Sequence, residues 1–86
     1  MDLSDWRARI DAVDRILLEL INRRMGYAQE IGRIKQALGQ QVRDPERERE
    51  IIRALQRHNQ GPLDGEAVAT IFGCIIGEAR RLEERD

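Results

Sequence analysis

Residues 4–38 read SDWRARIDAVDRILLELINRRMGYAQEIGRIKQAL and form one uninterrupted helical pattern. Positions of one stripe recur at gaps that alternate between three and four residues, which is the spacing of a heptad-like seam along a helix. Ser4 is the predicted N-cap, and Gly39 is the predicted C-terminal stop. We therefore predict one long helix from about Ser4 to Leu38. The seam positions are Leu3, Trp6, Ile10, Val13, Leu17, Leu20, Arg24, Tyr27, Ile31, Ile34 and Leu38.

Two glycines interrupt this helical pattern, Gly26 and Gly32. Each costs about 1 kcal/mol relative to alanine in the interior of a helix. We interpret them as positions at which another element of structure approaches the helix closely.

Two polar stretches, each closed by a proline, separate this helix from two further segments. The second segment begins at Asp44-Pro45, which places a capping carboxylate before a proline at the first helical position. The third segment follows Pro62, with Asp64 as its predicted N-cap. Apolar residues in both segments recur at helical spacing, and neither segment shows the alternation of a strand. We predict an all-α fold with three helices in a single domain, residues 1–86.

The length of the first helix predicts a dimer. About 35 residues at about 1.5 Å each span roughly 52 Å, whereas a compact chain of 86 residues has a radius of gyration of roughly 12 Å. Two shorter helices cannot cover the whole seam of so long a helix, so a second copy should bury it in an intertwined symmetric homodimer. A plain coiled-coil dimer, with the second and third helices folded back, is the alternative.

Composition excludes several classes of function. Fifteen basic and sixteen acidic residues give a net charge of -1, whereas general nucleic-acid binding needs a basic surplus. No apolar run approaches the roughly 20 residues of a membrane span, and the first residues lack a secretory core, so we expect a cytoplasmic protein. The single Cys74 cannot form an internal disulfide, and no metal-ligand cluster or phosphate loop appears, so we expect neither metal nor cofactor. We expect the single His58 in a solvated loop.

Several charged residues stand at positions that should face the interior. Arg24 occupies a seam position, and Lys35 lies about three turns further along almost the same face. Arg47 and Glu48 share the inner face of the second helix, and Glu83 continues the apolar stripe of the third. Inward charges are costly unless they pair or bind a ligand. They predict either a buried salt-bridge network or a water-poor cationic pocket for a small anion.

Arg7 does not fit the same pocket within its own chain. It lies 17 residues before Arg24, which is about 100° around the helix and about 25 Å along it. Arg7 could therefore serve such a pocket only from the partner subunit. No nucleophile–base pair appears in the sequence, so an enzyme of this kind would act through binding, orientation and electrostatics.

These residues, in this order, resemble the all-helical (AroQ-type) chorismate mutases, and the resemblance covers nearly the whole chain. It implies an intertwined three-helix homodimer with two equivalent active sites. It also implies the Claisen rearrangement of chorismate to prephenate, in phenylalanine and tyrosine biosynthesis, without a covalent intermediate. The motifs that carry it are Arg7-x-x-Ile10-Asp11-x-x-Asp14, Asn22-Arg23-Arg24, Ile31-Gly32-x-x-Lys35, Val42-Arg43-Asp44-Pro45-x-Arg47-Glu48 and Gly61-Pro62-Leu63-Asp64.

The resemblance implies that basic residues hold the substrate and act on its breaking bond. Arg24 and the partner subunit's Arg7 should each clamp one substrate carboxylate. Arg47 should support the site near Arg7 or a carboxylate. Lys35 should contact the ether oxygen and a carboxylate, where a compact point charge would stabilise the negative charge that grows as the bond breaks.

The resemblance also implies roles on the other side of the site. Glu48, with the backbone around Asp44, should bind the ring hydroxyl. Glu83 stands where the bacterial pattern usually has glutamine, so it could donate a hydrogen bond to the ether oxygen only when protonated. We expect burial and substrate charge to raise its pKa and activity to favour acidic pH. Ala79 stands where the pattern often has serine, and Arg80 adds a charge near the pocket edge. The implied pocket walls are Ile31, Ile51 and Ile76.

Two other functions fit parts of the same pattern. Isochorismate-pyruvate lyases share this scaffold and much of this pocket, and the sequence separates them poorly from mutases. A non-catalytic dimerisation or regulatory module, associated with a shikimate-pathway enzyme, is the third hypothesis. The complete set of inward charges argues against a purely structural role.

Overall fold

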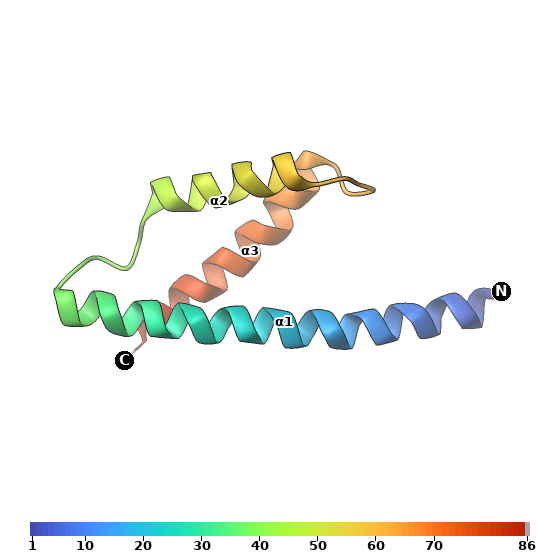
Figure 1. The fold of residues 1–86 in the computed structure, drawn as a ribbon, viewed down its shortest axis with the longest axis horizontal. Coiled ribbons are helices and arrows are strands. Elements are labelled where there is room, and N and C mark those ends of the chain that lie inside the picture. The colour runs from blue at the N-terminus through green and yellow to red at the C-terminus, as the bar shows by residue number, and fades with distance from the viewer. Residues whose placement is uncertain (86) are drawn as a thin grey trace.

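Three helices follow one another along the chain in the computed structural model, which describes residues 1–85 (Figure 1). Helix α1 spans Leu3–Leu38, α2 spans Pro45–His58 and α3 spans Gly65–Glu84. No residue in the described range belongs to a strand, so the predicted all-α class with a long first helix is confirmed. Among these helices, none combines the length and the apolar character needed to cross a membrane.

The start of α1 differs from the prediction. Asp2, not Ser4, is the N-cap, and its carboxylate accepts a hydrogen bond from the backbone N–H of Asp5 at 3.0 Å. The Asp5 carboxylate in turn accepts from the backbone N–H of Asp2 at 3.1 Å. This reciprocal capping box satisfies two backbone donors, whereas a serine cap would satisfy one. At the other end, Gly39 adopts a left-handed conformation with φ of 69°, as predicted.

The starts of α2 and α3 follow the prediction. The side chain of Asp44 accepts a hydrogen bond from the backbone N–H of Arg47 at 3.1 Å, and Asp64 does the same for Ala67 at 2.8 Å. The end of α2 does not follow it, because His58 is the last helical residue and not a loop residue. Its side chain is exposed as expected, and a basic side chain there interacts favourably with the C-terminal end of the helix dipole.

Helix α3 holds the chain together because it packs against both other helices, whereas α1 and α2 lie apart within the described residues (Figure 1). The buried apolar side chains concentrate along this packing. They are Ala28 on α1 and Val68, Ile76 and Ala79 on α3. The core of a single chain is therefore small and centred on the predicted inner stripe of α3.

Gly32 marks the closest approach of α1 and α3. A Cβ atom on Gly32 would lie 2.9 Å from both the Cα and the carbonyl oxygen of Glu83, closer than packed atoms allow. The predicted close approach is thus confirmed at Gly32. No such approach is found at Gly26, where no described atom beyond its chain neighbours and the local helix backbone lies within 4 Å of such a Cβ.

The N-terminal half of α1 stands clear of the rest of the chain. The molecule measures 55 × 25 × 15 Å with a radius of gyration of 15.9 Å, against roughly 12 Å for a compact chain of this length. Every side chain in residues 1–20 is exposed, including Trp6 at 53% and Ile10 at 59%. Large exposed apolar surfaces of this kind are typical of sites at which a protein contacts another molecule. Such an elongated shape is consistent with the predicted intertwined dimer.

Substitution of Gly32 tests the close approach of the two helices. Gly32→Ala should lower the free energy of unfolding by about 1–3 kcal/mol, because the added methyl group forces α3 away from α1. Gly73→Ala is the matched control on α3, where a Cβ would meet no described atom within 4 Å. It should raise stability by about 0.5–1 kcal/mol through helix propensity alone. Urea unfolding of both variants at one protein concentration makes the comparison, and equal responses would contradict the assignment.

Candidate active site

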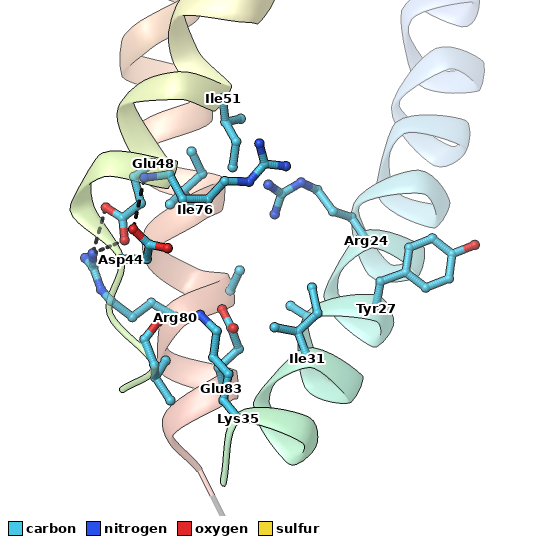
Figure 2. A pocket seen from close by; sticks show the side chains of 14 residues that line it. Arg24, Tyr27, Ile31, Lys35, Asp44, Glu48, Ile51, Ile76, Arg80 and Glu83 are labelled. Atoms are coloured by element: carbon cyan, nitrogen blue, oxygen red, sulfur yellow. Dashed lines mark hydrogen bonds and ion pairs between the residues drawn. The ribbon is translucent and has the colours of Figure 1, made fainter. Parts of the chain in front are cut away.

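A cavity of about 410 Å³ opens between α1, α2 and α3, in the size range of small-molecule sites (Figure 2). It exists because α3 spaces α1 and α2 apart instead of letting them pack together. Side chains from all three helices and from the α1–α2 linker line it. They are Arg24, Tyr27, Ala28, Ile31, Lys35, Val42, Asp44, Arg47, Glu48, Ile51, Ile76, Ala79, Arg80 and Glu83.

The cavity brings together every predicted site residue except Arg7. Arg7 lies in the N-terminal half of α1, in a shallow depression shared with Leu3 and Asp11. This placement agrees with the expectation that Arg7 cannot reach the pocket of its own chain. The roles assigned to these residues remain predictions.

Three of the lining residues were not predicted from the sequence: Tyr27, Ala28 and Val42. Ala28 lies one helical turn after Arg24, so helical spacing alone could have identified it. Tyr27 was assigned to the seam, and Figure 2 shows its ring pointing away from the other labelled side chains. Val42 sits in the linker, where no periodic pattern exists to place it.

Two cations project into the cavity from α1. Arg24 and Lys35 are partly buried, and Figure 2 shows Arg24 and Ile31 pointing from α1 toward the side formed by α2 and α3. The Lys35 Nζ atom donates a hydrogen bond to the carbonyl oxygen of Val42 at 3.0 Å. This bond ties the α1–α2 linker to the end of α1 and holds the ammonium group at the cavity. Within residues 1–85, Arg24 makes no ion pair.

The cavity is more positive than the chain as a whole. Its lining carries four basic and three acidic side chains, a formal surplus of +1, while the whole chain carries -1. The basic residues are Arg24, Lys35, Arg47 and Arg80, and the acidic residues are Asp44, Glu48 and Glu83. Only one ion pair joins two of these seven in the described structure, so the charges surround a cavity and do not form a closed salt-bridge network. Such a lining favours a small anion.

That one ion pair connects α2 to α3. The Nη1 atom of Arg80 donates to both carboxylate oxygens of Glu48, at 3.0 and 2.8 Å (Figure 2). The two side chains are 27% and 23% exposed, so solvent screens this pair less than a surface pair. The sequence indicated Arg80 only as an additional charge near the pocket edge. The structure shows it as the partner of Glu48.

Glu83 is an acidic residue of the site whose pKa is shifted by its surroundings. Burial raises the pKa of the Glu83 carboxyl above its ordinary value, and the nearby charges of Lys35 and Arg24 partly oppose this shift. The negative charges of Glu48 and Glu84 add to the rise. This is the direction of shift that the sequence predicted for a buried carboxyl at this position. A protonated Glu83 can donate a hydrogen bond, which an ionised carboxylate cannot.

The lining defines what chemistry the site can perform. None of the lining residues is a serine, threonine, cysteine or histidine, and within residues 1–85 no three side chains of histidine, cysteine, aspartate or glutamate are arranged so that they could hold a metal ion. The groups present are fixed cations, apolar walls and a protonatable carboxyl. Such a site can bind an anion, hold it in one conformation and stabilise negative charge that develops on it.

Comparisons with known proteins converge on one family. The family model described as chorismate mutase type II matches residues 6–84. A bifunctional chorismate mutase/prephenate dehydratase from Pseudomonas aeruginosa is 41% identical over 87 residues, covering 95% of this chain and 24% of that protein. This chain therefore spans about a quarter of the length of such bifunctional relatives. A chorismate mutase from Methanocaldococcus jannaschii is 34% identical over 87 residues, covering 96% of this chain and 85% of that protein.

Solved structures agree with these sequence matches. Chorismate mutase (form II) from Thermus thermophilus superposes with a TM-score of 0.95 at 36% identity, covering 98% of this chain and 96% of that chain. Chorismate mutase from Helicobacter pylori in complex with prephenate superposes with a TM-score of 0.88 at 32% identity, covering 95% of this chain and 89% of that chain. The three-helix arrangement is thus shared along nearly the whole chain.

Replacement of Glu83 tests its environment through folding stability. A carboxyl whose pKa is raised in the folded state contributes stability that is present below its ordinary pKa of 4.5 and is lost as pH rises through the raised pKa. Glu83→Gln removes this loss, so it should raise the urea midpoint at pH 7, and the gain should shrink toward about pH 4. Glu84→Gln, at the exposed neighbouring position, is the control; it removes only a minor charge that raises the pKa of Glu83, so its pH-dependent gain should be much smaller. A Glu83→Gln gain that is the same at both pH values would contradict the assignment.

Proposed function

We propose that this chain, which belongs to the chorismate mutase type II family, catalyses the rearrangement of chorismate to prephenate. The observation that carries the proposal is the cavity between the three helices, which gathers cations, apolar walls and a protonatable carboxyl around one space. A one-substrate pericyclic reaction needs no nucleophile, which fits a lining without serine, threonine, cysteine or histidine. We place the reaction in the cytoplasm, in the biosynthesis of aromatic amino acids.

Substrate binding in this proposal requires two subunits. Chorismate is a dianion, and Arg24 clamps one of its carboxylates from within the chain. The partner subunit's Arg7 clamps the other, and Arg47 supports that end of the site. Two observations support the homodimer: the apolar N-terminal half of α1 is exposed, and Arg7 lies outside the cavity of its own chain. An antiparallel second copy of α1 would cover this apolar half and bring Arg7 to the cavity of the partner subunit.

The remaining lining residues fix the conformation of the substrate. Glu48, with the backbone around Asp44, accepts the hydrogen bond of the ring hydroxyl. Ala79 offers no hydroxyl at its position, so the substrate has one contact fewer there. Apolar walls exclude water and favour a compact chair, in which the two carbons that bond lie close together. The walls are Ile31, Ile51 and Ile76.

Catalysis follows from charge that exists only in the transition state. The ether C–O bond breaks while a C–C bond forms within the same molecule, and negative charge grows on the ether oxygen. Lys35 places an ammonium group beside that oxygen, and protonated Glu83 donates a hydrogen bond to it. Both interactions strengthen as the charge grows, so they lower the barrier rather than merely holding the substrate.

A chorismate assay across pH tests both the reaction and the role of Glu83. The wild-type chain should convert chorismate to prephenate, with a kcat that falls as pH rises through the raised pKa of Glu83, because only the protonated carboxyl can donate. Glu83→Gln keeps a donor at every pH, so its profile should be flat over about pH 5–8. Chorismate consumption and prephenate formation are measured together at each pH.

Each outcome of this assay has a clear meaning. Identical pH profiles for the wild type and Glu83→Gln would show that Glu83 is not the titrating donor. Incubation with isochorismate is the parallel arm, and formation of salicylate and pyruvate in place of prephenate would replace the mutase assignment with a lyase. Absence of turnover of either substrate by an intact dimer would favour a non-catalytic module.

Mixing two inactive variants tests the shared active site. Arg7→Ala and Arg24→Ala should each lower kcat/KM by about 100-fold, because each removes a clamp on a substrate carboxylate. Refolded together in equal amounts, they form hybrid dimers in which one cavity carries both substitutions and the other carries none. Random assortment should restore about a quarter of the wild-type activity.

The control pair for this experiment is Arg24→Ala with Arg47→Ala. Both residues line the cavity of their own chain, so every cavity of a hybrid keeps one defect and no activity should return. Failure of the Arg7→Ala and Arg24→Ala mixture to recover would show that Arg7 does not act across the interface. Full activity of Arg7→Ala alone would remove Arg7 from the site.

A further inference from the structure

We infer that Arg80 is a positioning residue, which holds the carboxylate of Glu48 at the cavity wall, where it accepts from the substrate hydroxyl. Arg80 also offsets the negative charge of Glu48, which would otherwise repel a dianionic substrate. This inference rests on the proposed function. It concerns a residue whose only expected property was a local charge. Three features of the molecule support it, which are the geometry of the pair, the surroundings of Glu48 and the charge of the cavity.

The Arg80–Glu48 pair differs from the other ion pairs of the described chain. It alone joins two helices, whereas the other four pairs connect residues three apart within one helix. The side chains of those four are 56–69% exposed, against 27% and 23% for Arg80 and Glu48. Exposed pairs contribute little to structure, but a partly buried pair with two short hydrogen bonds holds its carboxylate in one place.

No other described residue holds the Glu48 carboxylate. On α2, Asp44 caps the helix through the backbone of Arg47, and the Arg47 guanidinium lies 3.8 Å from Glu50. On α1, Lys35 donates to the linker and Arg24 makes no ion pair within residues 1–85.

On α3, the groups that face Glu48 are Arg80 and the Glu83 carboxyl. Without Arg80, Glu48 would be free to sample its rotamers and would face only like charge from α3. A mobile acceptor is a weaker acceptor, because its ordering must then accompany substrate binding.

The net charge of the cavity lining also depends on Arg80. The lining carries four basic and three acidic side chains, so loss of Arg80 lowers its formal charge from +1 to 0 with Glu83 ionised, and from +2 to +1 with Glu83 protonated. In either protonation state of Glu83, a dianion would then enter a site with weaker net attraction from this subunit. The effect applies to the bound substrate and to the transition state alike, so it should appear mainly in KM and less in kcat.

The experiment compares Arg80→Gln with a matched control on the same helix. Arg81→Gln is the control, because Arg81 is 69% exposed and pairs only with Glu78, one turn away. Arg80→Gln should raise KM for chorismate by about tenfold and lower kcat by less than about threefold, as expected when the substrate hydroxyl loses its hydrogen bond to an ordered carboxylate. Arg80→Lys keeps the charge and should recover most of the KM. Arg81→Gln should leave both constants within about twofold of the wild type, as is usual for a surface position.

A double substitution separates positioning of Glu48 from a general effect. In a Glu48→Gln background, Arg80→Gln should change KM by less than about threefold, since the carboxylate it holds is gone. Equal effects of Arg80→Gln in both backgrounds would overturn the inference. So would a lower KM in Arg80→Gln, which would mean that Arg80 holds Glu48 away from the substrate. A lowered urea midpoint with unchanged KM would show that the pair only joins α2 to α3, and would also overturn it.

The wild-type measurement keeps this test distinct from that of the proposed function. A wild-type chain that leaves chorismate unchanged would overturn the proposed function, and the inference with it. An active wild type, together with an Arg80→Gln variant that matches Arg81→Gln, would overturn the inference alone.

Discussion

Gly32 lets the backbone of α3 approach α1 more closely than any side chain at that position would permit. The contact lies near the C-terminal end of both helices, so it fixes where α3 leaves α1. It places the side chain of Glu83 beside the face of α1 that carries Arg24 and Lys35. Since α2 packs only on α3 among the described helices, the position of α2 follows from the same contact. A cavity then remains between α1 and α2, and the N-terminal half of α1 remains uncovered.

The charged cavity lowers the stability of the fold while it provides the groups that the proposed function needs. Four basic side chains and three acidic ones surround the cavity, and burial raises the pKa of Glu83, so the folded chain holds an acid in surroundings that disfavour its ionised form. A single chain has only a small buried core to offset the free-energy cost of these partly buried charges. In the proposed function, the two negative charges of the substrate would offset the repulsion among these cations, so the lining would favour a dianion as the ligand.

Periodicity predicted most of the fold, because helix ends and inner faces depend on residues close together in the chain. The caps at Asp44 and Asp64 and the inward positions of Arg24 and Lys35 are of this kind. The N-cap of α1 was missed because Asp2 and Asp5 cap each other, and the two-bond arrangement prevails over a single serine. The pairing of Glu48 with Arg80 could not be predicted from spacing. It depends on how α2 lies on α3, which no pattern within one helix specifies.

Arginine and lysine occupy positions in the cavity that match their different chemistries. The chain has fifteen basic residues, and its one lysine, Lys35, lines the cavity. A planar guanidinium can bind a carboxylate with two hydrogen bonds. Arg80 makes two such bonds to Glu48, with one nitrogen shared between the two oxygens. Arginine therefore suits a carboxylate that stays charged throughout a reaction. A compact ammonium places its charge at one point, which suits an oxygen whose charge appears only in the transition state. The hydrogen bond from Lys35 to the linker restricts the position of its ammonium group, so in the proposed reaction this charge would need little reorganisation as the ether bond breaks.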